Sequence, residues 1–197
     1  MGELKNKTEA ELENELKGLI EVRDILDDMN LTWFLSGGAL LGAVRNNDFI
    51  KWDWDVGIAL LIEEISDPYS IINSFEKNGF KLDKFIDQKG NMKFLFIKYH
   101  VTFELLCWYK GIYYRKRKAF KRPSKFYSNQ FDIVKIRQHS FRAPKNVEAF
   151  LNFVYGKDWK QPKRTNHKSA YFNNKNFRFN WKKNLKKFLW IFKIEKS

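Results

Sequence analysis

Residues 34–60 constrain the fold more than any other part of the chain, and they read FLSGGALLGAVRNNDFIKWDWDVGIAL. The pattern predicts a short buried strand over residues 31–35, a break at residues 36–38, a short helix over residues 39–44, and a second strand over residues 53–60. A helix made of such small apolar residues packs closely on a sheet. The chain therefore has to fold into a domain that combines helices with a sheet.

The rest of the sequence predicts elements in an order typical of a mixed sheet flanked by helices. Thr8 and Glu11 form a capping box ahead of an apolar period of three to four residues, and Asp67 caps a helix that begins at Pro68. The predicted elements are helices over 9–29, 68–79 and 147–155, strands over 80–86, 92–99, 101–109 and 131–136, and a basic helix over 181–194. This order predicts an α/β (α+β) fold with two parts: a domain over residues 1–162 and a basic, aromatic C-terminal extension over residues 163–197.

The net charge of +14 is divided unevenly along the 197 residues. Residues 1–108 hold 12 Lys and Arg against 19 Asp and Glu, whereas residues 109–197 hold 25 against 4. An acidic half joined to a basic half indicates an anionic partner for the basic half. Nucleic acid, anionic lipid and nucleotide phosphates all fit this description.

Several classes of protein are excluded by composition. The single cysteine, Cys107, excludes an intramolecular disulfide and a multi-cysteine zinc site. The three histidines, His100, His139 and His167, are too widely spaced for a His-rich metal site. No run of about 20 apolar residues predicts a spanning helix, and the acidic, polar first residues do not resemble a signal peptide. We therefore expect a reducing, cytoplasmic setting.

Two features of the first stretch belong together chemically. Gly37 and Gly38 let the backbone approach a phosphate, and the free N–H groups at a helix N-terminus favour an anion. Asp53 and Asp55, at i and i+2 of a strand, point to one face and form a ready site for Mg²⁺, which substrate phosphates usually complete. Glu104, in a later strand, is a candidate third ligand or a base for an acceptor hydroxyl. Taken singly, these features have plainer interpretations: a turn, a solvated pair and a surface residue on an edge strand.

Three segments together resemble the LicD family of phosphotransferases, which includes the fukutin-type and fukutin-related proteins. The family pattern G-[TS]-L-L-G-x-x-R is matched by residues 38–45, GALLGAVR, and F/L-I-P-W-D-D-D-I-D-I is matched by residues 49–58, FIKWDWDVGI. Farther along, Y-G-x-x-W-x-x-P is matched by residues 155–162, YGKDWKQP. The matches follow the family's order, and the resemblance covers about residues 12–162.

The resemblance implies a nucleotidyltransferase-type fold and a transfer reaction. A phosphate-linked group, of the phosphocholine or polyol phosphate type, would pass from a CDP-activated donor to a sugar hydroxyl of a surface glycan, as in lipopolysaccharide biosynthesis. The implied cofactor is Mg²⁺, with Mn²⁺ as the other candidate. Carried over by position, Gly38 with its neighbours Ser36 and Gly37 would cradle the donor phosphate, and Arg45 would follow on the phosphate-binding helix.

The same resemblance implies catalytic and metal-binding roles for Asp53, Asp55 and Glu104. The sequence departs from the family pattern at two informative positions: Gly57 stands in place of the last acid, and Ala39 replaces a hydroxyl residue. Two alternatives therefore stay open. One is another nucleotidyltransferase, and the other is a catalytically weakened member that acts as a basic nucleic-acid or membrane-surface binding module.

The basic half contains two segments that bear on partners. Residues 109–127 hold eight Lys and Arg, six Tyr and Phe, no acid and no clear period. They fit phosphate binding beside the active site, a nucleic-acid surface or a solvated face, and the family resemblance favours the first. Residues 181–194 suit an anionic membrane interface, with a terminal helix packed on the domain as the alternative. The expected partners are thus a CDP-linked donor, a saccharide or glycolipid acceptor and an anionic membrane surface, rather than nucleic acid.

Overall fold

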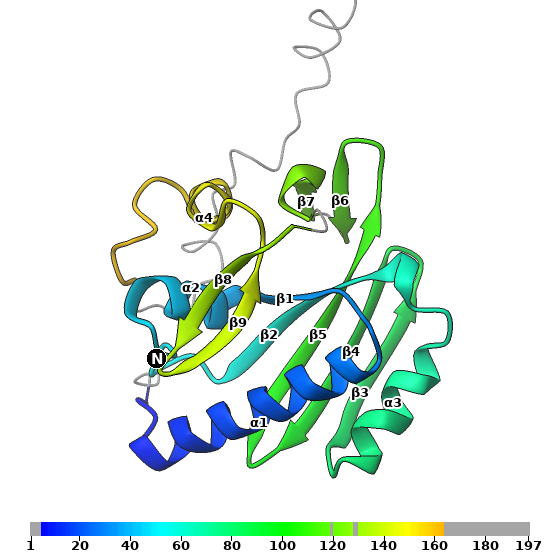
Figure 1. Ribbon diagram of the computed structural model, residues 1–197, viewed down its shortest axis with the longest axis horizontal. Helices are drawn as coiled ribbons and strands as arrows, with labels where there is room; N and C mark the ends of the chain where they lie inside the picture. Colours follow the sequence, from blue (N-terminus) through cyan, green and yellow to red (C-terminus); the bar gives the residue numbers. More distant parts are fainter. Residues whose placement is uncertain (1–4, 119, 128–129, 164–197) are drawn as a thin grey trace, which may run out of the picture.

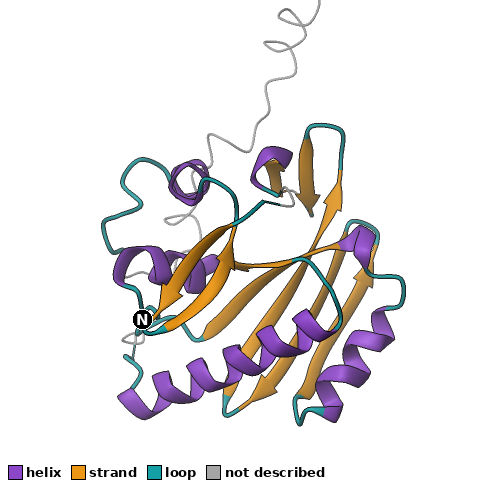
Figure 2. Cartoon of the chain, viewed as in Figure 1, coloured by secondary structure: helices purple, strands orange, loops and turns teal. Residues whose placement is uncertain are grey.

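The computed structural model describes residues 5–118, 120–127 and 130–163, which form a mixed sheet with helices packed against it (Figures 1 and 2). The helices are α1 (Glu9–Asp28), α2 (Gly37–Asn46), α3 (Pro68–Lys77) and α4 (Val147–Tyr155), with 3₁₀ turns η1 (Ile62–Glu64) and η2 (Ser124–Phe126). The strands are β1 (Trp33–Ser36), β2 (Asp55–Leu61), β3 (Lys81–Gln88), β4 (Asn91–Lys98), β5 (Val101–Lys110), β6 (Tyr114–Arg117), β7 (Phe120–Pro123), β8 (Asp132–Ile136) and β9 (His139–Ala143). The predicted α/β class is confirmed, while the predicted helix over 181–194 lies outside the described residues.

Helix α1 begins at the predicted capping box and covers the sheet. The Thr8 Oγ1 accepts from the Glu11 N–H at 3.3 Å, and the Glu11 carboxylate accepts from the Thr8 N–H at 2.7 Å. Its buried apolar side chains are Leu12, Leu16, Leu19, Val22, Ile25 and Leu26. Gly18 lies so close to Phe103 of β5 that a Cβ there would be 2.4 Å from the ring. Since Phe96 of β4 pairs with Phe103 and stacks on Phe75 of α3, α1 and α3 cover the same face of the sheet.

The main sheet runs in the order β1-β2-β5-β4-β3, with β6 and β7 added beyond the end of β5. All neighbours are antiparallel except β2 and β5, which run parallel at the centre of the sheet. In this parallel pair Asp55 lies opposite Thr102 and Gly57 lies opposite Glu104. The topology therefore brings the start of β2, where the acidic pair is found, next to the start of β5.

Two predicted boundaries near residues 34–60 are corrected by the structure. The strand predicted from residue 53 begins at Asp55, because the Asp53 N–H donates to the Ile50 carbonyl at 3.0 Å and closes a turn. The helix predicted over residues 39–44 is longer and begins at Gly37, so the glycine pair forms its first turn rather than a break before it.

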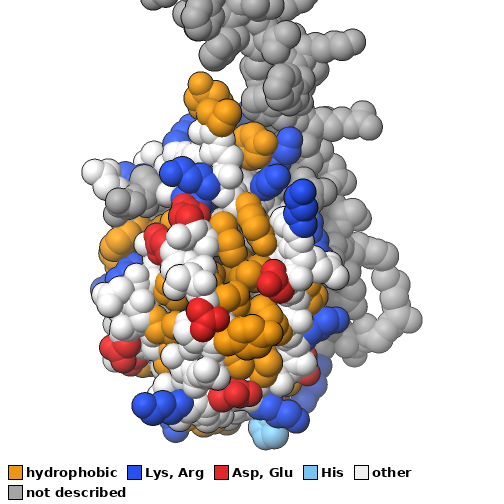
Figure 3. Space-filling view, turned by 90° about the vertical axis from the view of Figure 1, so that its right-hand side faces the viewer, with side chains coloured by type: hydrophobic (Ala, Val, Ile, Leu, Met, Phe, Trp, Pro, Cys, Tyr) orange, Lys and Arg blue, Asp and Glu red, His pale blue; other side chains and the backbone are white. Residues whose placement is uncertain are grey.

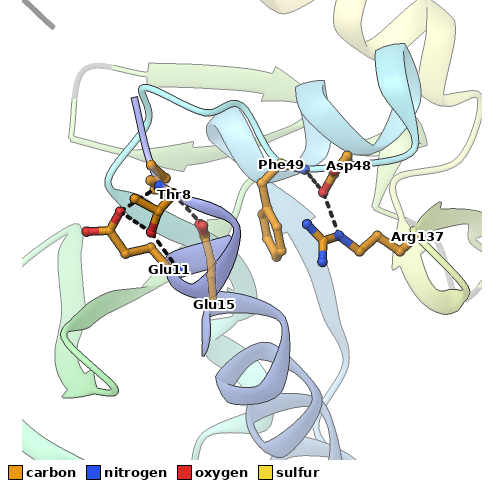
Figure 4. Close-up of polar contacts among 7 residues, drawn as sticks. Thr8, Glu11, Glu15, Asp48, Phe49 and Arg137 are labelled. Carbon is orange, nitrogen blue, oxygen red and sulfur yellow. Dashed lines mark hydrogen bonds and ion pairs between the residues drawn. The ribbon is translucent and has the colours of Figure 1, made fainter. Parts of the chain in front are cut away.

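The basic segment that lacks a clear period folds into the hairpin β6–β7, and a second hairpin, β8–β9, follows it. Of this second hairpin, the strand over 131–136 was predicted and β9 was not. Arg137 in its turn donates its N–H to the Asn47 carbonyl at 2.5 Å and forms ion pairs with Glu9 (2.6 Å) and Asp48 (3.2 Å), the last of which Figure 4 shows. These contacts fasten the hairpin to α1 and to the loop that follows α2.

The face that carries α3 and β3 mixes hydrophobic and charged side chains (Figure 3). Tyr69 of α3 is 63% exposed and packs edge-on against Phe85 of β3, with ring centroids 5.9 Å apart. Charged residues such as Lys81 and Asp83 lie exposed along this edge strand and oppose pairing with another sheet. Within the described ranges, no helix is both long and apolar enough to cross a membrane.

Candidate active site

The turn from β1 into α2 presents a helix N-terminus without a side-chain cap. Ser36, the last residue of β1, is 2% exposed and makes no capping hydrogen bond to α2. Gly37 has a φ of +61°, which glycine adopts without strain, so the strand turns directly into the helix. Free N–H groups in a first helical turn attract anions. Ser36, Gly37 and Gly38 all line one cleft, which is where a donor phosphate was predicted to lie.

Asp53 and Asp55 lie side by side where the chain enters β2. Asp53 packs against α2 so tightly that a Cβ on Gly38 would be 1.4 Å from the Asp53 Oδ2, so any larger residue there would displace this carboxylate. Burial, together with the neighbouring Asp55, raises the pKa of Asp53 to about 7. Two carboxylates that disfavour each other's charge are a place where a bound cation is favourable. The structure thus brings the predicted pair together, although through a turn rather than along one strand face.

A buried ion pair lies beside these two aspartates. The side chains of Lys7 and Glu15 are 3% and 2% exposed and contact each other directly. The Lys7 Nζ also lies 5.8 Å from the ring centroids of Phe49 and Trp54. Burial raises the pKa of Glu15 to about 7, even though Lys7 lowers it. As Figure 4 shows, Glu15 points from α1 toward the chain segment at Thr8, so this pair holds that segment against α1. The Lys7 N–H also donates to the Lys51 carbonyl at 2.7 Å, which joins the segment to the turn ahead of the aspartates.

Glu104 lies in the same cleft but is engaged elsewhere. Its Oε1 accepts from the Lys93 Nζ at 2.6 Å. Across residues 5–118, 120–127 and 130–163, no three Asp, Glu, His or Cys side chains gather closely enough to hold a metal ion. The structure therefore groups Asp53 with Asp55 and leaves Glu104 with Lys93. Its role as a third metal ligand stays a prediction.

The cleft that these residues share has a volume of about 500 Å³, within the range of pockets that hold nucleotide-sized ligands. One part of its wall is acidic and carries Asp53, Asp55 and Glu104. Another part comes from β5, β6, β7 and the turn between the last two, and carries Trp108, Arg117, Lys118, Phe120 and Arg122. The cleft thus places carboxylates and cations around one space, as transfer of a phosphate-linked group requires.

Arg45 and Tyr155 connect the two parts of this wall. Burial lowers the pKa of Arg45, and burial raises the pKa of Tyr155 to about 12. The charges of Asp53 and Asp55 raise the Tyr155 pKa further, while Arg122 lowers it, so the phenol lies near both the aspartates and the arginine. The downstream YGKDW segment belongs to the site because Tyr155 ends α4 inside the cleft.

Several lining residues were not assigned to the site from the sequence. Lys93 gives no signal there, because it is one of many lysines on a predicted hairpin. Arg117 and Arg122 belong to the basic run 109–127, for which phosphate binding was one of three interpretations. Their position in the cleft favours that interpretation over a solvated face.

The mixed sheet, the uncapped helix N-terminus and the acidic pair at the next strand define a nucleotidyltransferase-type fold with a transferase site. The family model described as LicD/FKTN/FKRP, nucleotidyltransferase domain, matches residues 30–146, more than half of the chain. The chain belongs to this family, and the enzyme class that the family defines is a transferase, which confirms the predicted resemblance.

Individual proteins give weaker and shorter matches. The chain is 30% identical over 66 residues to Ribitol 5-phosphate transferase FKRP of Mus musculus and of Homo sapiens. The match covers 34% of this chain and only 12% of each relative's length. Among solved structures, the solution structure of the antibiotic-resistance factor ANT(2'')-Ia superposes with a TM-score of 0.54 at 15% identity, covering 81% of this chain and 82% of that one. This likeness supports the fold alone.

Proposed function

We propose that this chain transfers a phosphate-linked group from a CDP-activated donor to a sugar hydroxyl of a glycan. The observation that carries the proposal is one cleft in which the Asp53–Asp55 pair lies against the uncapped N-terminus of α2 at Gly37 and Gly38. Family membership supports a phosphate-linked group, and the curated relatives that it resembles are named as transferases of ribitol 5-phosphate. The polyol phosphate type of group follows from that name, with phosphocholine as the other type.

The residues at the acidic pair fit a divalent cation of the Mg²⁺ type. The raised pKa of Asp53 reflects its burial and the unrelieved charge of Asp55, and both carboxylates supply the oxygen ligands that Mg²⁺ prefers. One or two protein carboxylates with substrate phosphates are a usual set for this ion, and Mn²⁺ accepts similar ligands. When bound, the ion would offset charge on the diphosphate and on the departing nucleotide.

The remaining residues orient the reactants and handle a proton. The backbone N–H groups of α2 near Gly38 hold donor phosphate oxygens, and Arg45 adds positive charge on the same helix. The acceptor oxygen forms a bond to phosphorus while the phosphorus–oxygen bond to CMP breaks, so CMP leaves with that electron pair. Glu104, separate from the aspartates, takes the acceptor proton on its carboxylate. Its contact with Lys93 orients this carboxylate.

The direct test measures CMP release from CDP-ribitol, CDP-glycerol and CDP-choline, each with a saccharide acceptor and Mg²⁺. We expect turnover with one donor, loss of turnover with EDTA, and loss in Asp55→Asn. Asp83→Asn, a change of the same kind at an exposed position of β3, serves as the control and should keep full activity. Absence of turnover and of Mg²⁺-dependent thermal stabilisation by every donor would count against the proposal.

We further propose that the enzyme works in the cytoplasm at a membrane surface, where glycolipid acceptors are found. The support is the basic, aromatic composition of residues 181–194. Co-sedimentation with anionic liposomes tests this: truncation after Asn180 should abolish binding, and unchanged binding contradicts it.

A further inference from the structure

Most arginines of the described chain have a carboxylate partner. Those that form ion pairs are Arg23, Arg115, Arg137 and Arg142. The others are Arg45, Arg117 and Arg122, and all three line the cleft. Within the described ranges, none of these three forms an ion pair with a carboxylate. Burial lowers the pKa of Arg117, and the charge of Glu104, which lines the same cleft, opposes that shift.

Two of these arginines are gathered around one buried tryptophan. Tyr109 of β5 pairs with Lys116 of β6, which places Trp108 next to Arg117 in the continuing register. The guanidinium of Arg117 lies 6.0 Å from the Trp108 ring centroid, and that of Arg122 lies 4.2 Å from it. Trp108 is 1% exposed, so its indole ring is held in place by packing, and the two guanidinium groups make cation–π contacts with it.

Two of these three side chains carry donors without acceptors. The Trp108 Nε1 and the Arg117 Nε are buried, and neither has a hydrogen-bond partner among the described residues. A buried donor left unpaired is costly, and such donors in a native protein call for an explanation. Both side chains line one cleft with Arg122, whose guanidinium donates to the Tyr127 hydroxyl at 2.9 Å.

We propose that Trp108, Arg117 and Arg122 form a phosphate-binding subsite on the wall of the cleft built by β5, β6 and β7. A phosphate oxygen would accept from the Trp108 indole N–H and from the Arg117 Nε–H, and Arg122 would supply the second positive charge. Two guanidinium groups beside each other suit a dianionic phosphate better than a single carboxylate, because their planar donors bind several of its oxygens at once.

This subsite is built on β5, β6 and β7, whereas the proposed donor phosphate site at Gly38 is on α2, and its place in catalysis rests on the proposed transfer reaction. Its phosphate has two sources that are chemically alike: the nucleotide half of the donor, or a phosphate carried by the acceptor. Tyr155, which lies near both Arg122 and the aspartates, marks where the two parts of the cleft meet.

The indole N–H of Trp108 gives a direct spectroscopic test in the full chain. Titration with inorganic phosphate, without divalent ions, should shift the Trp108 indole resonance in a ¹H–¹⁵N spectrum, because the N–H gains an acceptor. The assignment comes from Trp108→Phe, which removes that resonance. A Trp108 indole resonance that stays fixed while phosphate reaches saturation elsewhere overturns the proposal.

Charge-removing variants provide the second readout. Arg117→Met and Arg122→Met should each weaken phosphate binding at least tenfold, since hydrogen bonds to charged groups are lost. Lys116→Gln removes one charge from an exposed position of the same hairpin and should leave binding unchanged. Equal affinities of Arg117→Met and Lys116→Gln refute the subsite. If a methionine variant fails to fold, Arg117→Lys keeps the charge without the Nε donor, and it should still bind more weakly than wild type.

Two further titrations distinguish a phosphate of the donor from a phosphate of the acceptor. If CDP alone shifts the Trp108 resonance, the bound phosphate belongs to the donor. If the resonance shifts only when a sugar phosphate is added to the CDP-bound protein, the bound phosphate belongs to the acceptor. In Asp55→Asn the Trp108 shift should persist while turnover is lost, because the subsite does not use Asp55. The wild type distinguishes this inference from the proposed function: a Trp108 shift without any CDP-donor turnover supports the subsite and counts against the transferase proposal, and full turnover without a Trp108 shift does the reverse.

Discussion

Replacing Lys7 by methionine tests the buried ion pair beside the acidic pair. Lys7→Met keeps an unbranched side chain of similar length and removes the cation that faces Glu15, whose side chain is 2% exposed. In the wild type, burial raises the pKa of Glu15 from 4.5 to about 7 even with Lys7 in contact. Without Lys7 the carboxylate has no partner, so the pKa of Glu15 must rise further.

The size of the effect follows from proton linkage. A raised folded-state pKa means that the folded protein binds more protons than the unfolded chain, so stability falls as pH rises through the interval between the two values. In the wild type this loss ends near pH 7, where the Glu15 pKa lies. In Lys7→Met the loss continues above pH 7 by about 1.4 kcal/mol per pH unit. The variant should therefore be about 2 kcal/mol less stable than wild type at about pH 8.5, beyond any constant difference at about pH 6.

Urea unfolding of both proteins, followed by tryptophan fluorescence across this pH range, measures the difference in free energy of unfolding. The double variant Lys7→Met/Glu15→Leu removes the carboxyl group, so its stability relative to Lys7→Met should grow with pH, while its stability relative to wild type should stop changing above about pH 7. Replacing a whole buried pair by apolar side chains is often neutral or stabilising. A pH-independent destabilisation by Lys7→Met, or a pH slope that survives in the double variant, would refute the argument.

Three further predictions concern the site and its support. Gly38→Ala places a Cβ 1.4 Å from the Asp53 Oδ2 and displaces that carboxylate, so CMP release should fall by about 100-fold while the urea midpoint hardly changes; wild-type turnover would contradict this. Gly18→Ala should destabilise the protein by about 1–3 kcal/mol in urea unfolding, because its Cβ would be 2.4 Å from the buried Phe103 ring; the gain of about 1 kcal/mol usual for alanine in a helix would show the reasoning to be wrong. Since burial and Asp55 raise the pKa of Asp53 to about 7, Mg²⁺ has to displace a proton below that pH. The Mg²⁺ affinity, measured by calorimetry, should therefore fall as pH drops from about 8 to about 6, and this fall should shift to lower pH in Asp55→Asn. A Mg²⁺ affinity that does not change over this pH range would contradict a metal site at Asp53 and Asp55.

The parts of the fold that the sequence predicts are those with strong local signals. The capping box at Thr8 and the apolar spacing after it predict α1 nearly to the residue, and the family pattern over residues 38–58 places α2 beside the acidic pair. These signals succeed because capping, helix period and glycine conformation depend on neighbouring residues. The boundary at Asp53 was predicted wrongly, since the turn there is closed by the Asp53 N–H donating to the Ile50 carbonyl, which leaves no periodic pattern in the sequence.

The parts that the sequence does not predict depend on distant contacts. The hairpin β6–β7 has no apolar alternation, because Arg115 is buried through its ion pair with Glu63 and Arg117 is half-buried beside Trp108. The pair formed by Lys7 and Glu15 joins an irregular segment to a helix and follows no motif spacing. From the sequence, such polar side chains are expected at the surface, and only tertiary contacts bury them.

Gly57 explains how the site differs from the family pattern in physical terms. A Cβ at this position would lie 3.0 Å from the Ser36 carbonyl oxygen, so the family's last acid would need the backbone of β1 to shift by a few tenths of an ångström. Only Asp53 and Asp55 are grouped at the start of β2, and two carboxylates neutralise less cationic charge than three. The phosphates of the proposed reaction would then rely more on cations of the protein, and Arg45, Arg117 and Arg122 line the same cleft.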